Sequence, residues 1–347
     1  MTNRIYIAAT SQHVGKTTCT LGIFSALRQQ GYHVGYCKPL GQEFVDLGDL
    51  KVDKDALLFA RMMDFELSAE QHSPVIVGSG LTTAYLDDPT RFDFQGRILA
   101  AAERLHAQHD VVVYEGTGHP GVGSVIDLSN AQVAKALQAS VVMIAEGGIG
   151  STIDDLNVKL ALFREQEVPI RGVKKLDAMR IPLLGVLPFD QNLTYPIMET
   201  IRRAVNGVTL FNEDKLDNWV EHTVSGALAE RGEIIPASRT LLIVGFRRIN
   251  DVIDVIEGMG NSEEPSPLAG IIVIGEYDFV PAFLADFPRR DYVEKHRIPV
   301  VATTLDTYGA ALKISRIEVK INLRTPWKVQ RAIEIVQAHV HLQPLGY

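Results

Sequence analysis

The stretch IYIAATSQHVGKTT, residues 5–18, predicts how the first part of the chain folds. It opens with a short, continuously apolar run, Ile5 to Ala9, which is typical of a strand covered on both faces of a parallel sheet. The nine residues after this run lead into a helical pattern over residues 19–29. We expect these nine to bind a phosphate chain: Thr10, Ser11, Gln12, His13, Val14, Gly15, Lys16, Thr17 and Thr18.

Phosphate binding is predicted because Gly15, Lys16 and Thr17 lie between a strand and a helix. Such a bend turns several backbone N–H groups and a helix N-terminus towards one point, where an anion is stabilised. Lys16 is expected to neutralise the β- and γ-phosphates, and the Thr17 hydroxyl to bind Mg²⁺. The alternative for Lys16 is a place on an ordinary surface turn. His13 either contacts phosphate or points outward from the loop.

Further apolar runs alternate with helical patterns across the first 190 residues. Because the runs are continuously apolar and helices separate them, we predict an α/β fold with a doubly wound parallel sheet. The runs are His33 to Cys37, Asp110 to Tyr114, Ser140 to Ala145 and Pro182 to Leu187. The helical patterns between them are Phe94 to Gln108, Asn130 to Leu137 and Ile153 to Arg164.

A second, smaller α/β domain is predicted, which gives domains at 1–205 and 206–347. Its expected strands and helices are Arg239 to Val244, Asn250 to Glu257, Ala269 to Ile274, Pro299 to Thr303 and Asp306 to Ser315. A last helix from Pro326 has one apolar face, formed by Val329, Ile333, Val336 and Val340. This spacing indicates that the helix packs on a core, and we assign it to the second domain.

Composition excludes several classes of protein. The chain has 347 residues, 46% of them hydrophobic, with a net charge of −8. These values argue against a disordered chain and against general nucleic-acid binding. The first apolar run is too short for a signal peptide or a membrane span. Two cysteines, Cys19 and Cys37, form neither a disulfide framework nor a zinc motif, so we expect a reducing, cytoplasmic location without a membrane partner.

Charged residues follow two of the predicted strands. The carboxyl ends of parallel strands face the ligand crevice, so Lys38 is expected either to point towards phosphate or substrate or to be a surface lysine. Glu115 is expected to bind Mg²⁺ directly or through water, and the glycines after it would admit substrate. Asp53 and Asp55 begin a helix and are either capping residues or metal ligands. Gly147, Gly148 and Gly150 either contact nucleotide or permit a tight turn.

Together these motifs resemble dethiobiotin synthetase and its relatives. The likeness covers residues 3–205 and rests on SQHVGKTT, Lys38-Pro39, Asp55-Ala56-Leu57, Glu115-Gly116-Thr117-Gly118 and the segment IPLLGVLPFD at 181–190. Threonine in place of the first Walker glycine, as at Thr10, is itself a feature of dethiobiotin synthetases. The relatives include the N-terminal domain of long phosphate acetyltransferases and the ATP-binding half of cobyrinic acid a,c-diamide synthases.

The resemblance implies a set of roles in an ATP- and Mg²⁺-dependent reaction. Lys16 and Lys38 would hold the transferring phosphoryl group, and Thr17, Asp55 and Glu115 would bind Mg²⁺. Gly116, Thr117 and Gly118 would lie against a carbamate acceptor. Related P-loop domains dimerise across the substrate site, which implies a homodimer.

Residues 206–347 resemble the DRTGG regulatory domain of long phosphate acetyltransferases. The signature has changed: Gly245-Phe246-Arg247 replaces Gly-Asp-Arg, and Ile274-Gly275-Glu276 replaces Thr-Gly-Gly. The segment that meets the base in the superfamily is also missing after Gly172, where the chain continues at once with Val173-Lys174-Lys175-Leu176. Base recognition is therefore not assigned.

Two functions remain open at this stage. The first is an enzyme, a ligase or ATPase that transfers a phosphoryl group to a small carboxylate or carbamate. The second is a nucleotide-sensing module without ligase activity that regulates a metabolic partner enzyme such as phosphate acetyltransferase. Retained Lys38 and Glu115 favour the enzyme, whereas the appended domain and the missing base-binding segment favour the sensor.

Overall fold

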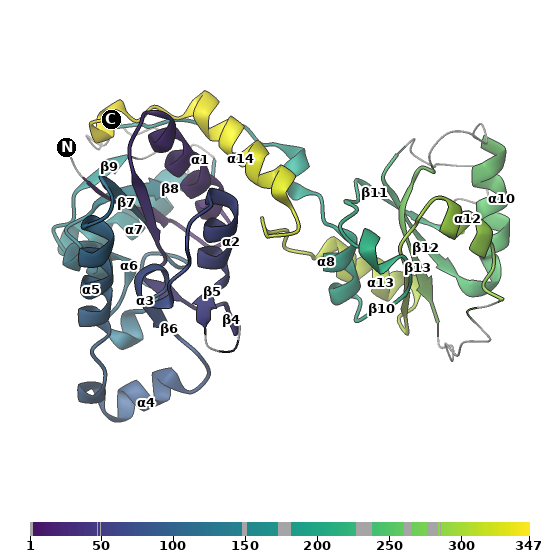
Figure 1. The fold of residues 1–347 in the computed structure, drawn as a ribbon, viewed down its shortest axis with the longest axis horizontal. Coiled ribbons are helices and arrows are strands. Elements are labelled where there is room, and N and C mark those ends of the chain that lie inside the picture. The colour runs from purple at the N-terminus through teal and green to yellow at the C-terminus, as the bar shows by residue number, and fades with distance from the viewer. Residues whose placement is uncertain are drawn as a thin grey trace. The chain divides into compact units, whose positions relative to one another are not determined.

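The computed structural model describes residues 3–46, 48, 50–147, 151–172, 182–226, 238–259, 266–275, 284 and 286–347 (Figure 1). The chain divides into two compact units, which are described separately. Unit 1 contains Met1–Phe189 and Ile321–Tyr347, and unit 2 contains Asp190–Lys320. The predicted domains, 1–205 and 206–347, differ from this division both where the second unit begins and where it ends. The predicted boundary at residue 205 falls at the end of a helix of unit 2, and the C-terminal segment returns to unit 1.

Unit 1 is built on a parallel five-stranded sheet in the order β2-β7-β1-β8-β9. Alternate residues of each strand enter opposite cores: Tyr6 and Tyr114 contribute to one, and Ile5 and Val113 to the other. Helices α5, α6 and α7 cover the first core. Helices α1, α2 and α14 cover the second. The strands are β1 (Arg4–Ala9), β2 (Val34–Cys37), β7 (Val111–Glu115), β8 (Ser140–Ile144) and β9 (Ile170–Gly172).

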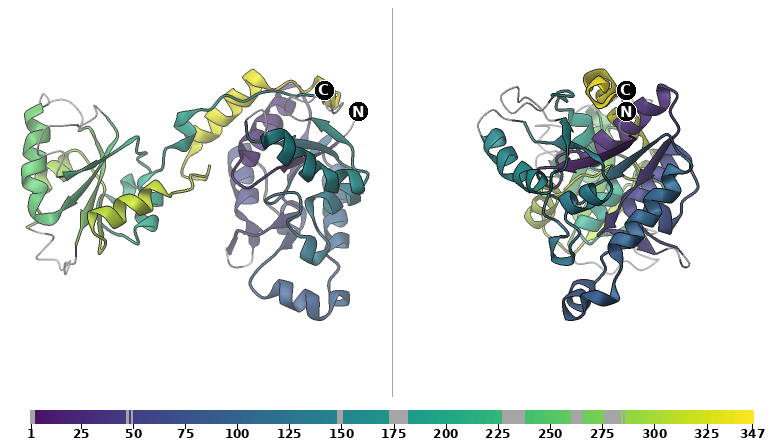
Figure 2. Two further views of the ribbon diagram at one scale, coloured as in Figure 1. Left: turned by 180° about the vertical axis from the view of Figure 1, so that it is seen from behind. Right: turned by 90° about the vertical axis from the view of Figure 1, so that its left-hand side faces the viewer.

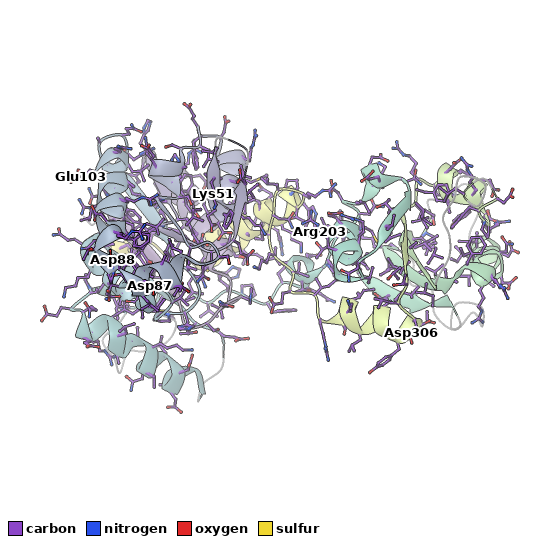
Figure 3. The ribbon with its side chains drawn as sticks, turned by 90° about the horizontal axis from the view of Figure 1, so that it is seen from below. Lys51, Asp87, Asp88, Glu103, Arg203 and Asp306 are labelled. Carbon is purple, nitrogen blue, oxygen red and sulfur yellow. The ribbon has the colours of Figure 1, made fainter. Side chains whose placement is uncertain are left out.

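In the described part of unit 1, long helices and several short elements connect or follow the strands. Asp88, labelled in Figure 3, follows α4 and caps η1 by accepting a hydrogen bond from the Thr90 N–H. The long helices are α1 (Lys16–Gln29), α2 (Lys54–Met63), α5 (Phe94–His106), α6 (Asn130–Ala136), α7 (Ser151–Glu165) and α14 (Pro326–His339). The short elements are β3 (Leu40–Gly41), β4 (Phe44–Asp46), β5 (Lys51–Asp53), α3 (Ala69–His72), β6 (Val75–Ile76), α4 (Leu81–Asp87), η1 (Pro89–Arg91), η2 (Ser124–Ile126) and η7 (Gln343–Leu345).

Helix α14 packs beside α1 in unit 1, so its assignment to the second domain was wrong (Figures 1 and 2). Gly22 of α1 makes this contact possible, because a Cβ atom there would collide with the side chain of Val336. Val329, Ala332 and Val336 are buried in the core that α1 covers. Of the predicted apolar face, Val329 and Val336 are buried, while Ile333 and Val340 are partly buried and Val340 follows the helix end. Periodicity does not say which core receives such a face.

The predicted strand from Pro182 to Leu187 was also wrong. Among the described residues of this segment, Gly185 makes an isolated bridge to Val340, and Leu184 accepts a hydrogen bond from the His341 N–H. The fifth strand of the sheet is β9, a segment without one of the apolar runs from which strands were predicted.

Unit 2 contains a five-stranded sheet in the order β10-β14-β13-β12-β11, parallel except for β10. Helices α10 and α12 pack on one face, and α8 and α13 on the other. Two α/β units, one with a parallel sheet and one with a sheet that is parallel except for β10, confirm the predicted fold class. The elements are η4 (Gln191–Thr194), α8 (Met198–Ala204), β10 (Val208–Phe211), η5 (Glu213–Lys215), β11 (His222–Ser225), β12 (Thr240–Gly245), η6 (Phe246–Arg248), α10 (Ile249–Met259), β13 (Leu268–Ile274), α12 (Arg290–Lys295), β14 (Val300–Thr303) and α13 (Thr307–Ser315).

Candidate functional site

The loop between β1 and α1 has the strand-to-helix geometry of a phosphate-binding loop. The Thr10 N–H donates to the Ile144 carbonyl at 2.9 Å, which attaches the start of the loop to β8. Gly15 caps α1 with a φ of 91°, a left-handed conformation that glycine adopts without steric cost. The first turn of α1 contains Lys16, Thr17 and Thr18 and no acidic residue. The helix N-terminus is therefore suited to an anion.

The Lys16 ammonium bridges the loop and the segment after β7. Its Nζ donates to the Gly118 carbonyl at 2.8 Å and to the Ser11 carbonyl at 3.3 Å. Gln12 and His13 are exposed, Ser11 and Val14 are half-buried, and His13 has a φ of 61°.

Lys38 directly follows β2 and lies among carboxylates, while its expected approach to phosphate or substrate stays a prediction. Its side chain is 6% exposed, and its Nζ contacts Asp55 Oδ2 at 2.7 Å, Glu115 Oε1 at 3.1 Å and the Gly116 carbonyl at 3.3 Å. Burial alone would lower the pKa of Lys38, but the charges of Asp55 and Glu115 outweigh burial and raise it. Lys38 is therefore a buried, charged ammonium, and the surface-lysine alternative is wrong.

Glu115 links Lys38 to the phosphate-binding loop. Its Oε1 accepts from the Thr17 hydroxyl at 3.1 Å as well as from Lys38. The Tyr36 hydroxyl lies 3.5 Å from Oε2. Burial raises the pKa of Glu115, although Lys38 opposes the shift. The carboxylate depends on its donors because a buried charge without partners is strongly disfavoured.

The two aspartates at the start of α2 have different roles. Asp53 is buried and caps the helix, since its Oδ1 accepts from the Asp55 N–H at 2.8 Å. Burial raises the pKa of Asp53 to about 7. The side chain of Asp55 is 32% exposed and contacts Lys38 directly. Of the two alternatives, capping applies to Asp53, while Asp55 faces the site.

The loop after β7 is held by Asn130, a residue outside the predicted site. Asn130 Oδ1 accepts from the Thr117 N–H at 3.0 Å, and its Nδ2 donates to the Thr117 carbonyl at 2.8 Å. Gly118 has a φ of 61°. Asn130 begins α6 and Tyr36 lies within β2, so in sequence they look like ordinary helix and strand residues. No sequence signal identified either of them.

The oxygen atoms around Lys38 are suited to Mg²⁺. Thr17, Asp55 and Glu115 offer one hydroxyl and two carboxylates, which are hard ligands. Within the described ranges there is no group of three or more His, Cys, Asp or Glu side chains that could hold a metal by itself.

Other candidate residues are not gathered at this point. Gly148, Gly150 and the Val173-Lys174-Lys175-Leu176 segment lie outside the described residues, while Gly147 lies in a bend after β8. A cavity of about 390 Å³ beside β2 is lined by residues such as Tyr36, His72 and His109 and by none of the predicted site residues. None of the described helices is long and apolar enough to span a membrane.

Comparison with known proteins agrees with this geometry. Residues 3–173 match the family model described as an AAA domain. This match, together with the strand-to-helix loop before α1, supports a P-loop ATP-binding domain. The phosphate acetyltransferase of Synechocystis sp. is 22% identical over 98% of this chain and 51% of its own length. That of Acinetobacter baylyi is 22% identical over 97% of this chain and 51% of its own length.

The cobyric acid synthase of Pelotomaculum thermopropionicum is 24% identical to this chain, in an alignment that covers 58% of this chain and 46% of the synthase. The chain spans about half the length of the curated relatives that it matches. Among solved structures, the chimerical protein CapA2B2 matches 49% of this chain and 74% of its own, with 14% identity and a TM-score of 0.32. The chain is similar in sequence to phosphate acetyltransferases, while the DRTGG likeness of residues 206–347 stays a prediction.

Proposed function

We propose that the P-loop domain binds Mg²⁺ and ATP and transfers a phosphoryl group to a small carboxylate or carbamate acceptor. The observation that carries the proposal is the position of the Lys38 ammonium, within 3.1 Å of both Asp55 and Glu115. Glu115 in turn accepts from Thr17 in the first turn of α1. Groups from four separate segments therefore meet beside the phosphate-binding loop.

Phosphoryl transfer needs positioning and charge neutralisation more than it needs a nucleophilic side chain. In the proposed complex Thr17, Asp55 and Glu115 hold Mg²⁺, which neutralises charge on the phosphates. Lys16 leaves the Gly118 carbonyl for the outer phosphates, and Lys38 turns from the carboxylates to the group in transfer. The backbone of Gly116, Thr117 and Gly118 faces the acceptor.

The test measures ADP release by the full chain with ATP and Mg²⁺, with and without 7,8-diaminononanoate and bicarbonate. We expect stimulation by the acceptor and a loss of about 100-fold or more in Lys16→Ala, because electrostatic groups at such sites contribute this much. Lys54→Ala is the matched control, since its ammonium makes an exposed ion pair with Glu43. Turnover that Lys16→Ala leaves intact would contradict the proposed role of the loop.

A second candidate is a nucleotide-sensing module for a partner enzyme, without ligase activity. It is favoured by the matches to phosphate acetyltransferases, which cover both units of this chain. In this case, calorimetry would detect binding of ATP and Mg²⁺, while the acceptor would not stimulate turnover. Nucleotide-dependent change in acetyl phosphate formation, on adding the chain to a purified phosphate acetyltransferase, would support the sensor. Unchanged formation would count against it.

A further inference from the structure

One buried side chain, Asn130, fixes the backbone of the loop after β7. It is 3% exposed and is the first residue of α6, whose capping box uses the neighbouring Ser129 and Gln132. Its amide bonds to the N–H and carbonyl of Thr117 and donates to the His119 carbonyl at 2.6 Å. Its backbone N–H donates to the Pro120 carbonyl at 3.0 Å. A single residue therefore holds residues 117, 119 and 120.

The partners of Asn130 require a neutral amide. Oδ1 faces two donors, the Thr117 N–H and the Tyr6 hydroxyl at 2.8 Å, whereas Nδ2 faces two carbonyls. Burial raises the pKa of Tyr6, so its hydroxyl remains a donor. An amide has two donors and one acceptor oxygen and satisfies all four contacts, but an ionised carboxylate has no donor. A carboxylate at this position would place negative charge against two carbonyl oxygens.

The loop that Asn130 holds contacts both lysines of the site. The Gly118 carbonyl accepts from Lys16 at 2.8 Å, and the Gly116 carbonyl accepts from Lys38 at 3.3 Å. Gly116 packs so closely on Asn130 that a Cβ atom at position 116 would collide with Oδ1 of Asn130. Movement of this loop would therefore displace the acceptors of both ammonium groups.

We propose that Asn130 is a positioning residue for the nucleotide site. It acts through the 116–120 loop on Lys16 and Lys38, and it contacts neither ATP nor Mg²⁺ itself. This inference rests on the proposed function. It predicts that affinity for ATP with Mg²⁺ depends on the hydrogen-bonding capacity of the side chain at position 130. Overall stability alone does not determine that affinity.

The test compares Asn130→Asp with wild type by calorimetry with ATP and Mg²⁺ across a range of pH. At about pH 8 the introduced carboxylate is ionised, and we expect about tenfold weaker binding, since losing one or two hydrogen bonds changes a binding constant by this order. Near pH 5.5 burial should favour the neutral carboxylic acid, which can donate again, and affinity should recover to within about threefold of wild type. Gln132→Glu is the matched control, because it adds the same charge on α6 and keeps the capping acceptor.

Circular dichroism at each pH verifies that the variants are folded. If Asn130→Asp does not fold, Tyr6→Phe replaces it, since it removes one donor to Oδ1 and keeps the ring; about threefold weaker binding is expected. Equal affinities of wild type and the tested variant, or a loss in Asn130→Asp that does not vary with pH, would overturn the inference. Absence of ATP binding by wild type would instead overturn the proposed function.

Discussion

Replacement of Lys38 by methionine tests whether this ammonium neutralises the buried carboxylates of the site. The side chain of Lys38 is 6% exposed and that of Glu115 is 1% exposed, whereas Asp55 keeps 32% of its side chain in solvent. Removing one partner of a buried pair costs about 3–5 kcal/mol, because the other charge is left without compensation. Since Asp55 remains hydrated, Glu115 carries most of this cost. We expect the free energy of unfolding of unit 1 to fall by about 3 kcal/mol near pH 8.

The loss should depend on pH in a defined direction. Burial raises the pKa of Glu115 above its ordinary value of 4.5, and without Lys38 the pKa rises further. The folded protein then binds a proton more tightly than the unfolded chain, so stability falls as pH rises above 4.5 through the raised pKa. Lys38→Met should therefore recover at acidic pH. Added Mg²⁺ should stabilise Lys38→Met more than wild type, because the ion can replace the missing positive charge.

The assay is urea unfolding of unit 1. Trp327 lies in unit 1 and Trp219 in unit 2, so Trp327 fluorescence in a Trp219→Phe background reports on unit 1. Lys54→Met is the control; its pair with Glu43 spans 3.6 Å between exposed side chains, and pairs of this kind contribute little. Equal stability of Lys38→Met and Lys54→Met at alkaline pH, or a deficit that grows on acidification, would refute the reasoning.

Three further predictions concern packing and protonation. Gly22→Ala should destabilise unit 1 by about 1–3 kcal/mol, as overpacking does. In a double-mutant cycle, Val336→Ala should relieve part of that loss, and independent effects of the two substitutions would contradict the α1–α14 contact. The raised pKa of Asp53 makes wild-type stability decline as pH rises from 3.8 to 7, so Asp53→Asn should flatten the pH dependence in that window. Identical pH profiles of urea unfolding for wild type and Asp53→Asn would contradict this. Gly116→Ala should weaken binding of ATP with Mg²⁺ in calorimetry, because its Cβ displaces the loop from Asn130; unchanged affinity would show that the loop tolerates the shift.

The amino-acid sequence by itself determined the elements whose signals are local. The P-loop was predictable because an apolar strand, Gly15-Lys16-Thr17 and a helical pattern follow one another directly. Lys38 and Glu115 were both expected at the crevice where the carboxyl ends of parallel strands lie, but their contact depends on β2 and β7 being neighbours in the sheet, which the structure shows. The role of Asp55 came from resemblance to a family, and the structure places this side chain against Lys38.

Only the tertiary structure decided which surfaces meet. Periodicity shows that one face of α14 is buried, but the contact with Gly22 spans most of the chain and depends on the packing of both helices. The hydrogen bonds of Asn130 join β1, the loop after β7 and α6, and a lone asparagine at a helix start carries no sign of them. Such partners are set by three-dimensional packing between distant segments, and residue type and spacing therefore do not reveal them.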